Sequence, residues 1–262
     1  MDLMDLVSER VGILYEGIWK ENQVKILEDA KYLPKITGEM LEVAKERFAA
    51  RKAKNPKIFD GNAFHLDLSQ SIIQKNRLIL AVGRMRYSIY DIARKEYADK
   101  YDWKELPSGM GTNVVVLTSD FKLVMHNRSS SVEHTAKIST IGGIYGGEHP
   151  FENIREELQE ELKLEKKEIK RLLLLGIYTR LDERVNHGLS FFAKTTLSTK
   201  EILKREQSLA EKEGEIFFLE KDPKVLRDYL MIHRQQILSD GFVGLVLAGR
   251  HLWGEDWSEI EK

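Results

Sequence analysis

Apolar and polar residues alternate with two different periods along the chain, and these periods predict its helices and strands. Apolar positions at helical spacing predict a helix over 36–53, capped at its N-terminus by Thr37, and a second helix over 87–97. An apolar stretch over 58–68 predicts a strand. The Asp60-Gly61 pair within this stretch predicts a hairpin turn there.

A loop from Pro107 to Gly111 separates this region from a second one in which strands dominate. Short apolar stretches predict five strands there, at 113–119, 122–127, 169–179, 189–197 and 215–219. An acidic helix lies between the second and third of them, and the tail from Pro223 has a helical pattern. Strands before and after a central helix favour a mixed sheet sandwiched by helices. We therefore predict an α/β protein with two domains, a smaller N-terminal α/β extension over 1–105 and an α/β/α sandwich over 106–262.

The composition excludes several classes of function. The 262 residues carry 41 Lys and Arg against 42 Asp and Glu, a formal charge of -1, so no overall field attracts nucleic acid or an anionic membrane. The basic stretch from Arg47 to Lys54 is interpreted as a solvated helix face. The absence of cysteine excludes disulfides, thiolate metal sites and a cysteine nucleophile.

A hydrophobic share of 42% is ample for a core, while no apolar run approaches the ~20 residues that span a bilayer. The first 17 residues contain two aspartates where a secretory signal is basic, and no continuous apolar segment. We therefore expect no export signal and a cytoplasmic protein with neither membrane nor nucleic-acid partners. The sequence leaves a homodimer open.

A glycine-rich loop followed by an acidic helix carries the candidate chemistry. The loop runs Gly142-Gly143-Ile144-Tyr145-Gly146-Gly147-Glu148, and its glycines let the backbone approach a ligand closely. On the helix, Glu157, Glu160 and Glu161 are predicted to share one face. Like charges at i and i+4 destabilise a helix by roughly 0.2–0.5 kcal/mol per pair, so we expect a compensating cation. Mg²⁺ suits such a site because it binds through a few carboxylates together with substrate phosphates.

A second interpretation of this stretch needs no ligand. Glu160 can pair with Lys163, three residues further on, and the acidic face is then simply solvated. The glycines can likewise form a turn and nothing more. It is the combination of loop and acidic helix that favours a functional site.

The same stretch resembles the Nudix box, G-x5-E-x7-R-E-U-x-E-E-x-G-U, in which U is a bulky aliphatic residue. Seven of its nine specified positions match, namely Gly142, Glu148, Glu157, Leu158, Glu160, Glu161 and Leu164. The two that differ are Glu156, where the family has arginine, and Lys163, where it has glycine.

This resemblance implies the Nudix fold and metal-dependent hydrolysis of a nucleoside diphosphate linked to another moiety. It implies that Glu157, Glu160 and Glu161 are the catalytic ligands of Mg²⁺ or Mn²⁺, and that Glu148 is an outer ligand or an orienting partner. In the family the ions polarise the pyrophosphate and lower the pKa of a bound water. The general base is left open between a glutamate of the box and a later loop that holds Glu211, Glu213 and Glu215.

The two departures from the box leave two functional hypotheses. Glu156 reverses the charge of the arginine that braces a box glutamate in the family, so Arg155 or Arg128 would have to substitute. Lys163 is expected to end the helix in the left-handed conformation at a cost of about 1 kcal/mol. The first hypothesis is an active hydrolase, and the second is a non-catalytic Nudix-fold module that senses a nucleotide or binds a partner. The retained carboxylates favour the hydrolase.

Segments outside the box resemble the animal UDP-glucose and UDP-galactose pyrophosphatase branch of the family, which also has an N-terminal extension and an altered box. They are 55–61 (NPKIFDG), 111–113 (GTN), 175–177 (LGI), 190–192 (SFF) and 215–218 (EIFF). This resemblance implies cleavage of a nucleotide sugar into a sugar 1-phosphate and a nucleoside monophosphate. ADP-ribose or a dinucleotide is the alternative substrate.

Four residues are candidates for contact with the substrate, and each has a simpler interpretation. The planar guanidinium of Arg128 suits a phosphate, but Arg128 can also be a surface arginine. Tyr145 can stack on a base or plug the glycine loop onto the core. His187 can meet a sugar or phosphate or be a solvated loop histidine, and Asn113 can bind a ligand or cap a turn.

Overall fold

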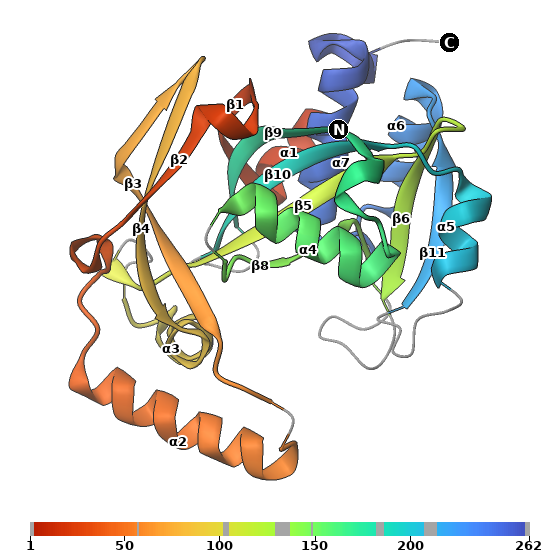
Figure 1. Ribbon diagram of the computed structural model, residues 1–262. Helices are drawn as coiled ribbons and strands as arrows, with labels where there is room; N and C mark the ends of the chain where they lie inside the picture. Colours follow the sequence, from red (N-terminus) through yellow and green to blue (C-terminus); the bar gives the residue numbers. More distant parts are fainter. Residues whose placement is uncertain are drawn as a thin grey trace.

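The computed structural model describes residues 3–56, 58–101, 105–128, 137–147, 149–181, 186–206 and 214–259. Most of their strands lie in one large sheet (Figure 1). Its main strands, in spatial order, are β1 (Val11–Trp19), β9 (Ile169–Arg180), β10 (Asn186–Thr195), β5 (Gly109–Leu117), β6 (Lys122–Arg128) and β11 (Gly214–Glu220). β10 and β5 are parallel, whereas the other neighbours along this order are antiparallel. The predicted mixed α/β architecture is therefore confirmed.

Helices cover both faces of the large sheet. Successive residues of a strand point to opposite sides, and the apolar residues on each side pack against helices. On one face, Val114 of β5 shares a hydrophobic core with Leu158 of α4 (Pro150–Leu162). On the other face, Val115 shares a core with Phe242 of α7 (Ser239–Trp253). Two further helices, α1 (Leu3–Arg10) and α6 (Pro223–His233), join this second core, and α5 (Thr199–Glu206) lies beside α4 and β11. None of the helices in the described ranges is long and apolar enough to cross a membrane.

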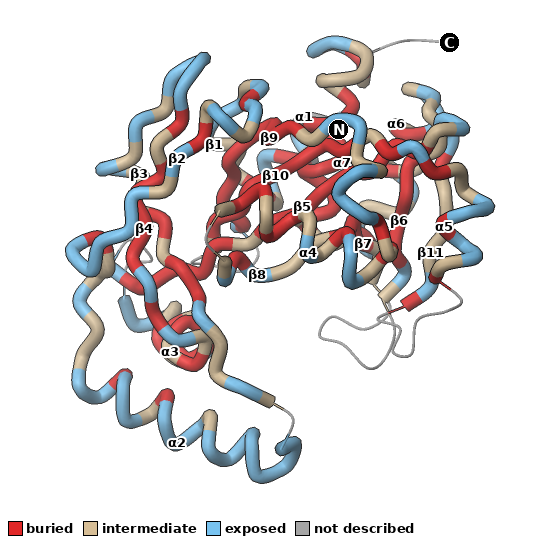
Figure 2. Tube along the Cα trace, viewed as in Figure 1, coloured by how far each residue is buried: buried red, intermediate tan, exposed pale blue. Residues whose placement is uncertain are grey.

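A three-stranded sheet forms a second unit beside the large sheet. Its strands are β2 (Val24–Glu28), β4 (Arg77–Arg86) and β3 (Asn62–Gln74), and its helices are α2 (Gly38–Lys54) and α3 (Tyr87–Ile92), the latter continuing as a π-helix over Ala93–Tyr97. The helix predicted over 36–53 is confirmed as α2, and its N-cap Thr37 accepts a 3.2 Å hydrogen bond from Met40 N. Most of α2 is exposed (Figure 2).

The two units do not divide at the predicted boundary of 105. β1 pairs with β9 along its length, and Val7 and Val11 are buried in the core beneath α7. The first strand of the chain therefore belongs to the large sheet, and the first helix packs into its core. The two units also share a core, in which Phe64 of β3 packs on Tyr145 with ring centroids 4.9 Å apart. A local sequence pattern does not show that β1 pairs with a strand so far along the chain.

The prediction of a hairpin turn at Asp60-Gly61 is wrong. β3 begins after this pair, and Lys75 and Asn76 form the turn between β3 and β4. Asp60 instead accepts hydrogen bonds of 2.8 Å from both the backbone N and the Oγ of Ser88, at the start of α3. The polar residue at this position caps a helix, because the first N–H groups of a helix have no partner within it.

The large sheet forks beside the glycine-rich loop. β5 and β6 pair at Leu117 and Leu123. Further along, β8 (Ile141–Ile144) pairs with β5, and β7 (Ile138–Ser139) pairs with β6. The first two glycines of the loop therefore belong to a strand inside the fork, with α4 directly above them.

Candidate active site

Helix α4, which carries the acidic residues, has well-defined ends. Pro150 occupies its first turn, where the missing N–H of proline costs nothing. At the other end Lys163 has φ 53° and ψ 34°, and Leu164 N donates to Leu158 O at 3.1 Å. The expected left-handed end at Lys163 is confirmed, so lysine in place of glycine keeps the helix boundary.

Two glutamates of α4 lie over the backbone of β8. Gly142 N donates a 3.1 Å hydrogen bond to Glu161 Oε1. A Cβ atom at Gly143 would lie 2.2 Å from Glu157 Oε1, so this carboxylate occupies the space that a side chain would need. Gly142 has φ +152°, and a Cβ atom there would lie 2.2 Å from Thr112 O of the paired strand. The loop therefore needs glycine for two reasons, the pairing of β8 with β5 and the close approach of the carboxylates.

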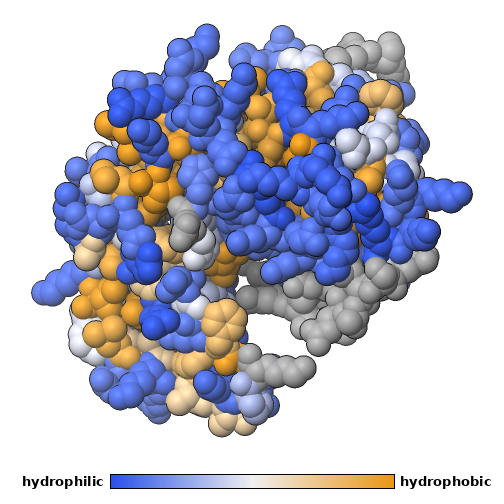
Figure 3. Space-filling view, viewed as in Figure 1, coloured by the Kyte–Doolittle hydropathy of each residue, from blue (hydrophilic) through white to orange (hydrophobic). Residues whose placement is uncertain are grey.

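The other two glutamates of the acidic run face solvent. Glu156 and Glu160 are exposed, and the outer surface of α4 is hydrophilic (Figure 3). At about 100° per residue, Glu161 lies some 40° around the helix from Glu157, whereas Glu160 lies some 60° away on the opposite side. The expectation that three carboxylates converge is therefore corrected to a pair, Glu157 and Glu161.

Among the described residues, no three or more acidic, histidine or cysteine side chains lie close enough to hold a metal ion together. Glu148, Glu211 and Glu213 lie outside the described residues, and Glu215 is exposed on β11. The preformed part of the candidate site thus consists of two carboxylates on one helix.

A buried histidine stands beside one of them. His126 of β6 is 4% exposed, and its Nδ1 lies 3.2 Å from Glu161 Oε2 without forming a hydrogen bond to any described residue. His126 Nδ1 and Glu161 Oε2 thus lie within ion-pair distance of each other beside the glycine backbone of β8. The oxygens of Glu157 and Glu161 suit a hard divalent cation, which prefers oxygen ligands.

Arg155 does not brace these glutamates. Its guanidinium forms ion pairs with Glu152 in the preceding turn and with Glu21, to which Nη1 donates at 2.9 Å. The hydrogen bond from Arg155 lowers the pKa of Glu21. Arg155 therefore connects α4 to the segment between β1 and β2, and does not replace the arginine missing at position 156.

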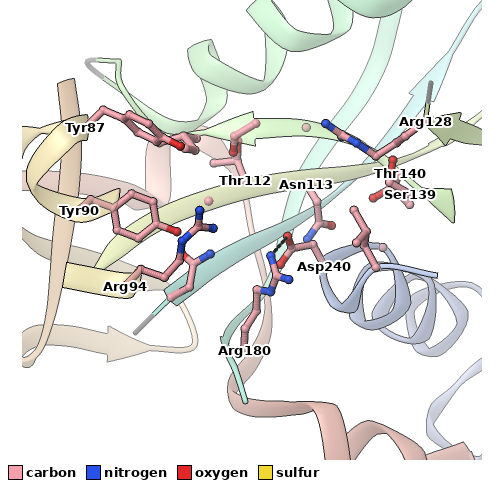
Figure 4. A pocket seen from close by; sticks show the side chains of 17 residues that line it. Tyr87, Tyr90, Arg94, Thr112, Asn113, Arg128, Ser139, Thr140, Arg180 and Asp240 are labelled. Atoms are coloured by element: carbon pink, nitrogen blue, oxygen red, sulfur yellow. Dashed lines mark hydrogen bonds and ion pairs between the residues drawn. The ribbon is translucent and has the colours of Figure 1, made fainter. Parts of the chain in front are cut away.

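A cavity of about 190 Å³ opens beside Gly142 and Gly143 (Figure 4). At one end lie Tyr87, Tyr90 and Arg94 of the three-stranded unit, and at the other Arg128, Ser139 and Thr140; Asn113, Arg180 and Asp240 lie between them. The described lining carries three arginines against one aspartate, so it favours an anionic ligand. Arg128 thus lines the cavity, as its candidate role requires.

The middle of the cavity is built on a buried hydrogen-bond network. Asn113 Nδ2 donates to the hydroxyl of Tyr178 at 2.8 Å, and this hydroxyl donates to Asp240 Oδ1 at 2.8 Å. Arg180 Nη1 donates to Asp240 Oδ2 at 3.0 Å. Burial, followed by the charge of Asp240, raises the pKa of Tyr178 well above its ordinary value. Asn113 therefore lines the cavity mainly as a support, holding Tyr178 and through it Asp240.

Of the two interpretations of Tyr145, the structure agrees with the second, a ring that plugs the glycine loop onto the core, whereas His187 agrees with neither of its two. Tyr145 is fully buried and packs on Phe64, so its ring plugs the loop onto the core and would have to leave the core to stack on a base.

His187 lies in β10, not in a loop, and lines a different cavity together with His65. Its Nδ1 is 2.6 Å from Thr179 Oγ1, and burial lowers its pKa to about 4. At neutral pH this uncharged histidine faces away from the cavity beside the glycines.

Several lining residues were not found from the sequence. Tyr87, Tyr90 and Arg94 lie at positions i, i+3 and i+7, which is the spacing of one helix face, so a signal existed. Arg94 Cζ lies 5.3 Å from the ring centroid of Tyr90, and its Nη2 is 3.3 Å from Asp91 Oδ1. Arg180 and Asp240 had no local signal, because their ion pair joins two distant segments.

Comparisons with known proteins found similar solved structures but no matching sequence family. No protein-family profile matches the sequence, and no curated protein matches it significantly. A mutT/nudix family protein from Listeria innocua is 16% identical, over 55% of this chain and 93% of that one, with a TM-score of 0.42. The NUDIX domain of Shewanella oneidensis NrtR, complexed with ADP ribose, is 13% identical, over 60% and 97%, with a TM-score of 0.40. Similarity at this level assigns neither a family nor an activity to this chain.

Proposed function

We propose that this protein is a metal-dependent pyrophosphohydrolase of the Nudix type, acting on a nucleoside diphosphate linked to another moiety. The observation that carries this proposal is the pair Glu157 and Glu161, held against the glycine backbone of β8, whose Gly142 and Gly143 also line the arginine-containing cavity. A carboxylate pair next to a basic cavity combines the two charges that this chemistry requires, one for a cation and one for phosphate.

Glu157 and Glu161 would hold the Mg²⁺ or Mn²⁺ ion. Mg²⁺ usually keeps several waters and binds proteins through one or two carboxylates plus substrate phosphates, which suits a site with two preformed carboxylates. Such an ion supplies Lewis-acid polarisation of the pyrophosphate and lowers the pKa of a bound water. Glu160 and Glu148 remain predicted ligands, and the general base remains open among the glutamates.

The other residues bind and orient the substrate. The N–H of Gly142 holds one oxygen of Glu161, which leaves the second oxygen for the cation site. The guanidinium groups of Arg94, Arg128 and Arg180 supply the positive charge and N–H donors that suit phosphate oxygens. Tyr87 and Tyr90 offer aromatic surface for a planar or sugar group.

For the substrate we propose a nucleotide sugar. Hydrolysis adds water across the bridging P–O–P bond and leaves a nucleoside monophosphate and a sugar 1-phosphate. A cytoplasmic location and a homodimer remain predictions.

The test is a panel of substrates incubated with Mg²⁺, with separation of the products: UDP-glucose, UDP-galactose, ADP-ribose, NADH and diadenosine polyphosphates. We expect cleavage of the UDP-sugars to UMP and sugar 1-phosphate, and no cleavage in EDTA. Preferential cleavage of ADP-ribose or of a dinucleotide would change the substrate but keep the reaction. Tight binding of one compound without cleavage of any would replace the hydrolase by the nucleotide-sensing module.

A further inference from the structure

Two buried hydroxyl groups without hydrogen-bond partners lie at one end of the cavity. Ser139 is 4% exposed and Thr140 is 5% exposed, and both line the cavity. Within the described part of the chain, neither Ser139 Oγ nor Thr140 Oγ1 has a hydrogen-bond partner. A buried hydroxyl is normally paired, because leaving it unpaired costs its full desolvation. Two adjacent exceptions therefore distinguish this end of the cavity as a place where polar groups lack partners among the described residues.

The surroundings of these hydroxyls favour an anion. Helix α7, 15 residues long, begins here: a Cβ atom at Gly241 would lie 3.1 Å from Thr140 N. Its N-cap, Leu238, offers no side-chain hydrogen bond to the first turn. The N–H groups of a first turn carry partial positive charge and lack partners within the helix. The guanidinium of Arg128 lies at the same end of the cavity (Figure 4).

Asp240 also lies in the first turn of α7, but its negative charge is paired. Its two carboxylate oxygens accept hydrogen bonds from Tyr178 and from Arg180. Its charge is thus offset by the arginine.

We propose that Ser139, Thr140 and Arg128, together with the first turn of α7, form a subsite for one phosphate group of the diphosphate. The assignment of this phosphate to the substrate rests on the proposed function. With one phosphate bound here, the remainder of the substrate extends past Arg180 toward Tyr87, Tyr90 and Arg94 at the opposite end of the cavity.

The test measures binding without catalysis. Inorganic pyrophosphate is titrated calorimetrically into the full chain in the presence of EDTA. We expect Thr140→Val and Ser139→Ala each to weaken binding about tenfold, which is typical for the loss of a hydrogen bond to a charged group. Because each variant removes an unpaired hydroxyl, its thermal unfolding midpoint should be no lower than that of the wild type.

Thr195→Val is the matched control. Thr195 is buried, but its hydroxyl donates to Glu168 O at 3.1 Å and accepts from Leu197 N at 3.2 Å, away from the cavity. This variant should lower the unfolding midpoint and leave pyrophosphate affinity unchanged. Equal pyrophosphate affinity of the wild type and the Ser139→Ala/Thr140→Val double variant overturns the subsite, and so does the absence of pyrophosphate binding to the wild type at millimolar concentration.

This experiment separates the subsite from the proposed reaction. If no substrate of the panel is cleaved but Thr140→Val still weakens pyrophosphate binding, the hydrolase fails and the subsite stands. If a nucleotide sugar is cleaved with the same KM by the wild type and the double variant, the hydrolase stands and the subsite fails.

Discussion

The inner and outer faces of helix α4 carry the same kind of side chain in different surroundings. Glu157 and Glu161 lie over the glycines of β8, where one accepts a backbone hydrogen bond and the other occupies the space above Gly143. Glu156 and Glu160 point into solvent. These carboxylates thus form a candidate site through the backbone that they approach, and not through their number on the helix.

Glu156, which departs from the Nudix box, lies on the outer face of α4. A side chain on the outer face does not contact the inner pair, so its reversed charge acts there only at long range and through water. Glu161 is instead contacted by the N–H of Gly142 and lies beside His126. The departure from the Nudix box at position 156 therefore lies on the face of α4 that does not carry the candidate metal ligands.

Neutralising an inner glutamate should have the largest effect. We expect Glu161→Gln to lower metal-dependent turnover by at least about 100-fold, because a ligand charge is lost. The fold should persist, because the amide oxygen of glutamine can still accept from Gly142 N. Turnover and the thermal midpoint are measured together, with Glu156→Gln as the same change on the outer face. Equal losses in both variants would abolish the distinction between the faces.

Alanine substitutions at the two glycines beneath the inner face should have different effects, one on stability and the other on turnover. Gly142→Ala places a Cβ atom against the backbone of β5 at a positive φ, so we expect a loss of about 2 kcal/mol or more in unfolding free energy. Gly143→Ala meets the movable end of Glu157, so it should cost less than about 1 kcal/mol but reduce turnover about tenfold. Chemical denaturation and kinetics check both. Full activity of Gly143→Ala would show that the position of Glu157 does not matter.

A third side of α4 is tied to the rest of the molecule by Arg155. We expect Arg155→Met to lower the unfolding free energy by about 1 kcal/mol at neutral pH through the lost ion pair with Glu21. The folded-state pKa of Glu21 is below its ordinary value, so this contribution is present at neutral pH and is lost as the pH falls through that pKa. Denaturation at a series of pH values measures it. A difference between wild type and variant that stays constant down to the most acidic conditions would contradict this ion pair.

The outer face should give the smallest effects. Glu156→Gln removes a repulsion with Glu160 one turn away, so the unfolding free energy should rise by about 0.2–0.5 kcal/mol while turnover stays within about twofold. Glu160→Gln tests the remaining predicted ligand, and its exposure leads us to expect a loss of less than about tenfold. A loss as large as that of Glu161→Gln would show that Glu160 contributes to the metal site as much as Glu161 does.

Several features that depend on neighbours along the chain were predicted from the sequence. The spacing of Glu157 and Glu161 places them on one helix face because the helical period is fixed. The left-handed end at Lys163 and the cap at Thr37 depend on a few adjacent residues, and both were predicted. The same helical period divides the acidic residues between two faces of the helix. It does not show which of these faces packs against the rest of the protein.

The sequence alone determined the mixed α/β class, the acidic helix and the glycines before it, because helix periods, strand alternation and turns are local properties. Only the tertiary structure decided that Tyr145 is buried, that His187 lines another cavity, and that β1 completes the large sheet. It also assembled the arginines, tyrosines and unpaired hydroxyls of the candidate substrate cavity from three separate stretches of chain. Contacts between distant segments depend on how the sheets and helices pack, and no local pattern encodes that packing.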